Sequence, residues 1–447
     1  MNQSFMKEKA VFPLLLSMSA PMILSMLINS LYNVIDSIFV TKYSTDAMTA
    51  LSLVYPLQNL IISISVGFGI AINVRIALDL GKGDPRSANR AATQGMLFSI
   101  LHGILLNIAA IAVMPAFLRM YTSDENIIGS GITYANIVFC FSTVNMIAIT
   151  YEKIYQALGK MVLTMISLIA GSITNIILDP IMIFGLGPVP EMGIRGAAWA
   201  TGIGQTVTLL VYLAMYLLRP IPVRLEKKYL KPDKNLLLHL YSIGIPATLN
   251  LALPSLMISA LNAILSAFSG LYVMVLGIYY KLQTLLYLPA SGIVQGMRPL
   301  ISYNYGAKEQ KRVRQIYHAA FIMTILFMVL GTLLCLTIPD TLIGLFTDDV
   351  TAVREGVTAL GIICIGFPVS ALSVVSAGAL EALGKGVQSL CISLLRYVLV
   401  LLPAAWILSR SNGAVGVWQA FPLAEFFTAI VAYGIYVHVM KKVMRYS

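Results

Sequence analysis

Residues 11–40 read VFPLLLSMSAPMILSMLINSLYNVIDSIFV, an apolar run that contains one carboxylate, Asp36. The run is longer than the roughly 20 apolar residues that a helix needs to cross a bilayer. It therefore predicts a membrane-spanning helix with Asp36 inside it. An ionised Asp near the middle of such a helix costs about 2.5 to 3.5 kcal/mol, and such residues usually face a bundle interior, a water-filled cavity or a bound cation. The alternative is an Asp at the helix end, already in water, that only ends the span.

The composition of the whole chain is that of a multi-spanning membrane protein. Of the 447 residues, 58% are hydrophobic and 11% are charged, whereas soluble proteins average about 25% charged residues. The net charge of +11 lies in short clusters between apolar spans, which indicates the membrane rather than nucleic acid as its partner. The four cysteines lie inside apolar runs without CxxC spacing, and we interpret them as packing residues: Cys140, Cys335, Cys364 and Cys391.

Charge clusters and Gly or Pro signals divide the chain into twelve predicted spans. They lie near residues 13–38, 49–74, 92–118, 131–151, 162–184, 196–218, 238–267, 273–297, 315–338, 356–380, 388–408 and 414–439. With the N-terminus inside, the inner segments hold 23 Lys and Arg residues and the outer loops hold five. Because basic residues concentrate on the cytoplasmic side, both termini are predicted to be cytoplasmic, in a multi-pass protein of the cell membrane.

The two halves of the chain repeat each other at an offset of 225 residues. An even number of spans in each copy keeps both copies in the same orientation, as two parallel bundles. We therefore predict an N-lobe at 1–218, a basic cytoplasmic linker at 219–237 and a C-lobe at 238–447. The matches include Pro21 with Pro246, Gly67 with Gly292, and Ala157 to Lys160 with Ala382 to Lys385; near the half-ends the offset falls by five, so that Gly193 and Gly196 match Gly413 and Gly416.

Two carboxylates are present in the first copy only. Asp36 maps onto Leu261 and Asp179 maps onto Ala404. Asn175 precedes Asp179 by one helical turn, so the two side chains share a helix face, and Thr201 lies on the next predicted span. Oxygen ligands of this kind suit hard cations or a proton. The alternative for Asp179 is a helix-end turn residue, because Pro180 follows it.

Four further charges lie inside predicted spans of the second half: Lys281, Glu381, Arg396 and Glu425. We expect Glu381 to form a hydrated local pair with Lys385 near a helix end. Lys281 and Arg396 are expected to be more buried, and either to pair with a carboxylate such as Glu425 or to line a cavity. The sequence does not choose between these roles.

The chain resembles multidrug and toxic compound extrusion (MATE) transporters, in particular exporters of low-GC Gram-positive bacteria. The stretches that carry the resemblance are Leu31 to Val40, Asn175 to Pro180, Gly193 to Thr201, Tyr279 to Gln283 and the doubled Ala-Leu-Gly-Lys. The resemblance implies an all-α protein with two six-helix lobes in a V-shaped arrangement. It also implies an antiporter that exports cationic, often aromatic drugs in exchange for Na⁺ or H⁺ by alternating access.

Carried over by position, Asp36, Asn175, Asp179 and Thr201 match the cation site of the family's N-lobe, with Na⁺ as a possible metal. We expect the substrate cavity to include Tyr32, Tyr55, Gln58, Tyr280, Lys281, Gln283 and Arg396. Some relatives carry an acidic pair in the C-lobe, but here the matching places are Pro254 and residues 370–376, which hold no acid. The resemblance therefore gives no coupling site in the C-lobe.

The sequence gives no sign of an enzyme. It contains no P-loop, HExxH or GxSxG pattern, so no catalytic residue and no cofactor is predicted. A channel is the second functional class, but two repeated bundles with asymmetric carboxylates are more typical of a coupled carrier. Within carriers, the alternative is a lipid-linked oligosaccharide flippase of the same superfamily, which is expected to have several basic residues in its cavity. We expect a monomer in the lipid bilayer that binds small organic cations.

Overall fold

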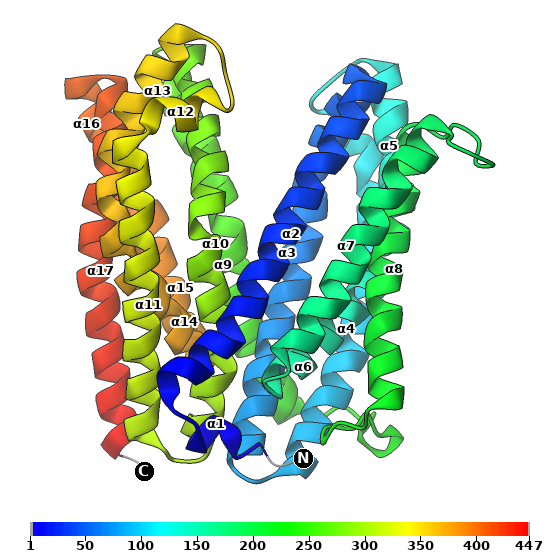
Figure 1. Ribbon diagram of the computed structural model, residues 1–447, viewed down its shortest axis with the longest axis vertical. Helices are drawn as coiled ribbons and strands as arrows, with labels where there is room; N and C mark the ends of the chain where they lie inside the picture. Colours follow the sequence, from blue (N-terminus) through cyan, green and yellow to red (C-terminus); the bar gives the residue numbers. More distant parts are fainter. Residues whose placement is uncertain (1–2, 446–447) are drawn as a thin grey trace. The chain divides into compact units, whose positions relative to one another are not determined.

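The computed structural model describes residues 3–445, and all regular structure in that range is helical (Figure 1). Eleven helices are long and apolar enough to cross a membrane, and the bent pair α5 and α6 makes a twelfth span when counted as one. Each of the twelve predicted spans overlaps one of them. The helices are α1 (Phe5–Glu8), α2 (Val11–Tyr43), α3 (Thr45–Gly81), α4 (Pro85–Arg119), α5 (Glu125–Cys140), α6 (Ser142–Ala157), α7 (Met161–Phe184), α8 (Ile194–Leu218), η1 (Lys227–Tyr229), α9 (Lys234–Ser266), α10 (Gly270–Gly306), α11 (Gln310–Thr337), α12 (Pro339–Gly344), α13 (Val350–Ile363), η2 (Cys364–Gly366), α14 (Phe367–Ala382), α15 (Gly386–Leu394), η3 (Leu395–Leu401), α16 (Leu402–Asn412) and α17 (Ala414–Arg445).

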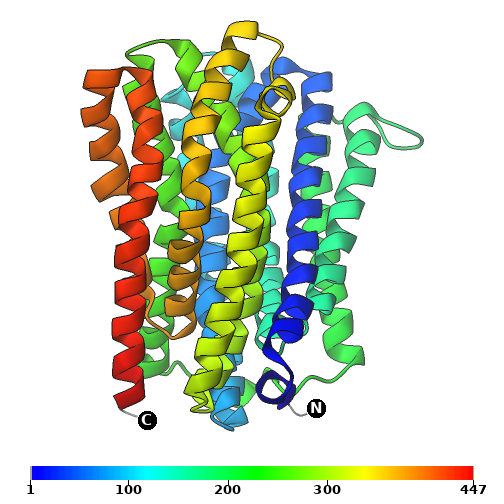
Figure 2. The same ribbon diagram turned by 60° about the vertical axis from the view of Figure 1, so that its left-hand side comes forward.

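Three spans are interrupted. The axis bends by 43° between α5 and α6, a short 3₁₀ turn joins α13 to α14, and the π-helical segment η3 lies between α15 and α16. Figure 2 shows α16 beside α17, in agreement with their many close backbone approaches. Since π-helical turns are rare and often occur at functional sites, η3 is a departure from regular helix geometry that singles out this place in the second half.

The chain packs as two compact units whose boundaries cut through two helices. Among the described residues, one unit comprises Gln3 and residues 24–244, and the other comprises residues 4–23 and 245–445. The first part of α2 therefore belongs to the unit of the second half, and the first part of α9 belongs to the unit of the first half. The predicted division into an N-lobe that ends at residue 218 and a C-lobe that begins at residue 238 stays a prediction.

The repeat is visible in how the helices begin. Ser44 caps α3 by accepting a hydrogen bond from Ala47 N at 3.3 Å, and Ser269, 225 residues later, caps α10 by accepting one from Leu271 N at 3.2 Å. Asp124 and Asp349 cap α5 and α13 in the same way. A side-chain oxygen at this position satisfies an otherwise unpaired N–H of the first turn. Scaffold residues are therefore kept in both copies.

Glycines at the turns are repeated as well. Gly159 and Gly384 have φ of 70° and 73°, and Gly193 and Gly413 have φ of 54° and 59°. Positive φ is accessible to glycine without the steric cost that other residues bear. The second pair confirms the sequence alignment in which the offset falls by five residues.

Each unit has its own hydrophobic core. In the first unit, side chains of α3, α4, α5 and α8 surround buried residues such as Phe139. In the second unit, α9, α10, α13, α14 and α17 surround Trp418, which is fully buried. All four cysteines are free. Cys335 and Cys364 are buried, as expected of packing residues, whereas Cys140 and Cys391 are exposed, so that interpretation was wrong for these two. Lipid-facing helix surfaces favour apolar side chains as much as the core does, and the sequence pattern alone does not separate the two.

Residues 1–2 and 446–447 lie outside the described residues, so the location of both termini in the cytoplasm stays a prediction. Arg75, Lys153 and Arg298, which were counted for the inner segments, lie well inside helices α3, α6 and α10 rather than in loops. Each contacts an acidic side chain at 2.7 or 2.8 Å. Pairing explains how these charges are accommodated inside helices.

Candidate functional site

Helices α7 and α8 of the first unit approach each other closely because both carry glycine at the interface. A Cβ atom at Gly171 would lie 1.9 Å from Thr208 Oγ1 and 2.6 Å from the carbonyl oxygen of Gly204. A Cβ atom at Gly204 would lie 2.8 Å from the carbonyl oxygen of Gly171. Small residues allow such close helix packing in membranes. This packing places the polar residues of the two helices against one another.

The close packing joins three of the predicted site residues. Asn175 is buried, and with its amide oriented to suit its neighbours it donates to Asp179 Oδ2 at 3.2 Å and accepts from Thr201 N at 3.2 Å. Asp179 is fully buried, although Pro180 follows it inside α7. Because α7 continues to Phe184, the alternative that Asp179 is a helix-end turn residue is excluded.

Asp36 on α2 completes the group. It is 9% exposed, and its carboxyl group lies next to that of Asp179. Its Oδ1 atom is buried and accepts no hydrogen bond among the described residues. The alternative of a hydrated Asp at the helix end is excluded here too, since α2 continues to Tyr43.

A fifth residue, Tyr134 on α5, was missed by the sequence analysis. It is 3% exposed, contacts Thr201 through its side chain and lies close to both carboxylates. Tyr32 on α2 also lies close to Asp36 and Asp179. We name Asp36, Tyr134, Asn175, Asp179 and Thr201 the acidic cluster.

The acidic cluster presents oxygen atoms from two carboxylates, an amide, a hydroxyl and a phenol. Two buried carboxylates in contact repel each other, so a proton or a cation between them stabilises the arrangement. Within residues 3–445 there is no group of three or more His, Cys, Asp or Glu side chains suited to a metal ion. Oxygen atoms are the usual ligands of hard cations, whereas transition metals favour imidazole or thiolate ligands. This set of oxygen donors therefore suits H⁺ or Na⁺ better than a transition metal.

The matching positions in the second unit are apolar. Leu261, at the place of Asp36, is fully buried in the hydrophobic core, and Ala404 and Val400, at the places of Asp179 and Asn175, pack against the same core. The acidic cluster is therefore specific to the first unit, while the surrounding scaffold is shared by both.

The residues expected in the substrate cavity fall into two sets, one in each unit. In the first unit, Tyr32 and Gln58 are half-buried, and Tyr55 is 56% exposed. In the second unit, Tyr280 and Gln283 are half-buried and Tyr280 packs against Phe421. No described cavity joins all of these residues, so their role in binding stays a prediction.

The two basic residues expected in the substrate cavity, Arg396 and Lys281, differ in burial. Arg396 on η3 is buried and donates through Nε to Glu425 Oε1 at 2.8 Å, as one of the two predicted alternatives proposed. Lys281 is exposed, with its Nζ 5.9 Å from the ring centre of Phe346, so the expectation that it is buried was wrong. Its long side chain carries the charge outward while the stem stays on the helix surface.

Glu381 does not form the local pair predicted for it. It is 7% exposed, and its Oε2 accepts from Arg298 Nη2 at 2.8 Å, while its Oε1 accepts from Asn250 at 3.0 Å and from Ser389 at 3.2 Å. The prediction was wrong because the fold brings α10 and α9 against α14 and supplies Arg298, a stronger partner than Lys385. Buried charges need such pairing.

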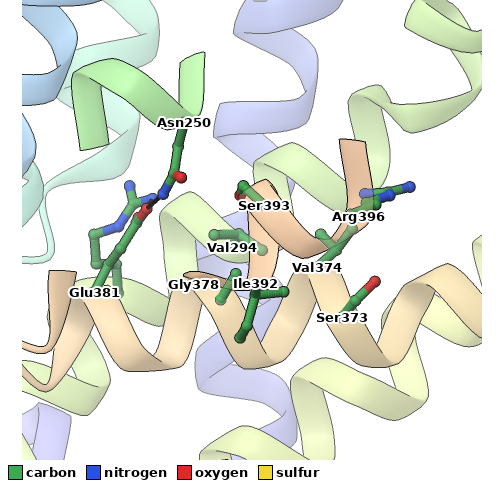
Figure 3. A pocket seen from close by; sticks show the side chains of 11 residues that line it. Asn250, Val294, Ser373, Val374, Gly378, Glu381, Ile392, Ser393 and Arg396 are labelled. Carbon is green, nitrogen blue, oxygen red and sulfur yellow. Dashed lines mark hydrogen bonds and ion pairs between the residues drawn. The ribbon is translucent and has the colours of Figure 1, made fainter. Parts of the chain in front are cut away.

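These residues lie at one end of a cavity of about 180 Å³ in the second unit. Figure 3 shows Asn250 and Glu381 directed toward each other, with Arg396 at the opposite end. Two small residues of its wall, Ala377 and Gly378, correspond to Glu152 and Lys153 in the first half. Those two side chains are buried and pair at 2.7 Å. The cavity is therefore space that an acid–base pair fills in the other copy.

These features define an all-helical, multi-spanning membrane protein with two repeated halves, of which one carries a buried acidic cluster. The model of the MatE family matches residues 21–181 and 246–407, one match in each half. The chain belongs to this family, which confirms the resemblance drawn from its residues.

Curated relatives cover nearly the whole chain. The chain is 25% identical over 433 residues to Multidrug export protein MepA of Staphylococcus aureus (strain MRSA252), which covers 96% of this chain and 94% of that protein. It is 22% identical over 429 residues to the protein of the same name from Staphylococcus saprophyticus, with the same shares. These relatives span the full architecture described above.

Solved structures share the fold. A crystal structure of MATE in complex with MaL6 has a TM-score of 0.93 and 21% identity and covers 100% of both chains. A MOP superfamily transporter from Pyrococcus furiosus, in which the reverse polarity of the binding pocket is described as suggesting a different function, has a TM-score of 0.93 and 20% identity. The match covers 99% of both chains. At these identities the likeness establishes the fold alone.

Proposed function

We propose that this protein is a multidrug efflux transporter of the cell membrane that exports lipophilic, mostly cationic compounds in exchange for H⁺ or Na⁺. The observation that carries the proposal is the contact between Asp36 and Asp179 inside the first unit, with Asp36 Oδ1 lacking a hydrogen-bond partner among the described residues. The names of the curated staphylococcal relatives support multidrug export as the class of activity.

The acidic cluster supports a cation as the coupling species. Among residues 3–445, neither carboxylate forms an ion pair with Lys or Arg. Because an unpaired buried carboxylate is costly in a membrane, binding of H⁺ or Na⁺ relieves this cost. Tyr32 lies near both carboxylates, and Tyr55 lies near Tyr32. Aromatic rings bind organic cations through their faces, which supports cationic substrates.

Exchange requires that the ion changes a conformational equilibrium. A ligand shifts the equilibrium between two conformations only when it binds one of them more tightly than the other. We propose that the ion binds the arrangement in which Asp36 contacts Asp179, and that the organic cation binds the other one. The two ligands then alternate, as in an antiporter with alternating access.

The flippase alternative is less well supported. A cavity for a lipid-linked anionic sugar would require free basic residues. In the second unit, Arg298 is neutralised by Glu381 and Arg396 by Glu425, at 2.8 Å in each case. Of the basic residues expected in the cavity, Lys281 alone forms no ion pair with a carboxylate within residues 3–445. One free positive charge supports a carrier of anionic sugars less well than an exporter of cations.

The test is transport by purified protein in liposomes under an imposed H⁺ or Na⁺ gradient, with a lipophilic cationic dye as substrate. We expect Asp36→Asn to keep the shape of the side chain but abolish gradient-driven transport, since Asn cannot exchange a cation. The gradient that drives the wild-type protein identifies the coupling ion.

Asp46→Asn is the matched control, because Asp46 is an exposed carboxylate in the first turn of α3. It should transport at the wild-type rate. Transport by Asp36→Asn at the wild-type rate under the same gradient would remove Asp36 from the mechanism, and failure of the wild-type protein to move any cationic dye would count against the whole function.

A further inference from the structure

A second cavity lies at the surface of the second unit, where the start of α2 meets the start of α11. Its volume is about 510 Å³. Lys9, Arg312 and His318 give it a basic part, together with the carboxylate of Glu8, and Phe12 and Ile322 give it an apolar wall. Phe12 is 49% and Ile322 51% exposed. We name this cavity the basic groove.

The first unit shows what fills the matching place there. On α4, Gln94 donates to the carbonyl oxygens of Tyr229 and Lys231 at 3.2 and 2.7 Å, and Thr93 accepts from the backbone N–H of Glu226 at 3.1 Å. The linker between the halves therefore covers this face of α4. Figure 1 shows this linker against the end of α4.

The second unit lacks these anchors. The residues 225 positions after Thr93 and Gln94 are His318 and Ala319, and both line the basic groove. Ala319 has no side-chain donor or acceptor that could hold a covering segment. The face that the linker covers in one copy is therefore open in the other, and its chemistry differs.

The N-terminal segment is fixed beside the groove. Arg312 donates through Nε to the carbonyl oxygen of Met6 at 3.0 Å and also donates to the carbonyl oxygen of Lys9. Glu309 is engaged by Lys7 at 2.8 Å. These hydrogen bonds hold the guanidinium of Arg312, and the ammonium of Lys9 lies 5.8 Å from the ring centre of Phe5. Among the residues that line the groove, Lys9 and Arg312 give two positive charges against the single carboxylate of Glu8. The groove is net basic at one end and apolar along its wall.

We propose that the basic groove binds an anionic phospholipid. The phosphate lies against Lys9, Arg312 and His318, and one acyl chain follows Phe12 and Ile322 along the lipid-exposed surface of α2 and α11. Both helices are membrane spans, so the groove lies where headgroups meet hydrocarbon. Basic pockets between spanning helices bind acidic headgroups in this way. Each Lys or Arg near an anionic surface strengthens binding about fivefold, from about 1 kcal/mol per charge.

The test uses a local fluorescent probe. In a Phe12→Trp variant reconstituted into bilayers, brominated phosphatidylglycerol and brominated phosphatidylcholine are compared as quenchers of the added tryptophan, after subtraction of the wild-type signal. We expect phosphatidylglycerol to bind more tightly than phosphatidylcholine. Adding Lys9→Gln should weaken phosphatidylglycerol binding about fivefold. Adding Lys311→Gln should leave it unchanged, because Lys311 is exposed on α11 and does not line the groove.

Equal quenching by the two lipids, or equal binding constants with and without Lys9→Gln, would overturn the proposal. A third measurement repeats the lipid comparison in the presence of inorganic phosphate. If millimolar phosphate removed the preference for phosphatidylglycerol, the groove would be a free-phosphate site and the lipid assignment would be wrong. The readout is lipid binding rather than transport, so its outcome is independent of the exporter function.

Discussion

The buried pair formed by Arg298 and Glu381 offers a sharp test of how the second unit is held together. It links α10 to α14 with a distance of 2.8 Å, and both side chains are 9% exposed. Asn250 of α9 and Ser389 of α15 donate to the same carboxylate. One charge pair therefore joins four helices.

The size of the effect follows from burial. Removing one partner leaves an uncompensated buried charge, which costs about 3 to 5 kcal/mol. We expect this loss for Arg298→Asn and for Glu381→Gln alone. The double variant carries the neutral residues found at the same positions of the first half, Asn73 and Gln156, and leaves no unpaired charge. It should recover about 2 to 3 kcal/mol as a coupling energy.

The assay is unfolding in mixed micelles of increasing SDS content, followed by tryptophan fluorescence, because Trp418 is fully buried in the second unit. The control pair is Arg354 and Glu355, which are 3.6 Å apart with the arginine 78% exposed. Replacing Arg354 by Asn should change stability by no more than about 1 kcal/mol. If the free-energy changes of the Arg298 and Glu381 variants added to within about 0.5 kcal/mol, the pair would not be a unit and the reasoning would fail.

Three further predictions concern the first unit. Gly171→Val should destabilise the first unit by about 3 kcal/mol, because the added side chain clashes with Thr208. Gly129→Val is the control and should have little steric effect, because a Cβ atom at Gly129 meets open space. Unfolding in SDS measures both changes in stability. Tyr134→Phe should slow gradient-driven transport about tenfold, the effect of losing a hydrogen bond to a charged or polar site, and wild-type rates would remove Tyr134 from the acidic cluster. Backbone N–H groups at the start of α9 hold the pKa of Asp233 below its ordinary value. The Asp233 cap therefore stabilises the linker above about pH 4, and this stabilisation is lost as the pH falls through the lowered pKa. Proteolysis of the linker at pH 7 and pH 3 measures the loss, and equal rates of cleavage would contradict it.

The architecture was largely predictable because hydropathy and the repeat depend on local sequence. Apolar runs gave all twelve spans, and the absence of a second copy singled out Asp36 and Asp179. The spacing of Asn175 and Asp179 by four residues correctly placed both on one helix face. These inferences need only the helical period and the alignment of two copies, which a sequence contains.

Pairing between helices was harder to predict, since it depends on which helices become neighbours. Glu381 was assigned to Lys385, four residues away, whereas its partner Arg298 is 83 residues away. The repeat did contain a signal, because Asn73 and Gln156 of the first half become Arg298 and Glu381 together. Two neutral positions that change to opposite charges in the other copy indicate a contact. Tyr134 gave no comparable signal, since a tyrosine in an apolar run is typical of any span.

The comparison of the two halves also explains why they should differ in function. In the second unit each buried acid has a basic partner, with Glu381 against Arg298 and Glu425 against Arg396. In the first unit, the contact between Asp36 and Asp179 has no basic partner among the described residues. A charge that is already paired gains little from an external cation, because the cation must first displace the arginine. On the proposed function, the exchanged cation therefore binds in the first unit, whereas the paired charges of the second unit hold its helices together.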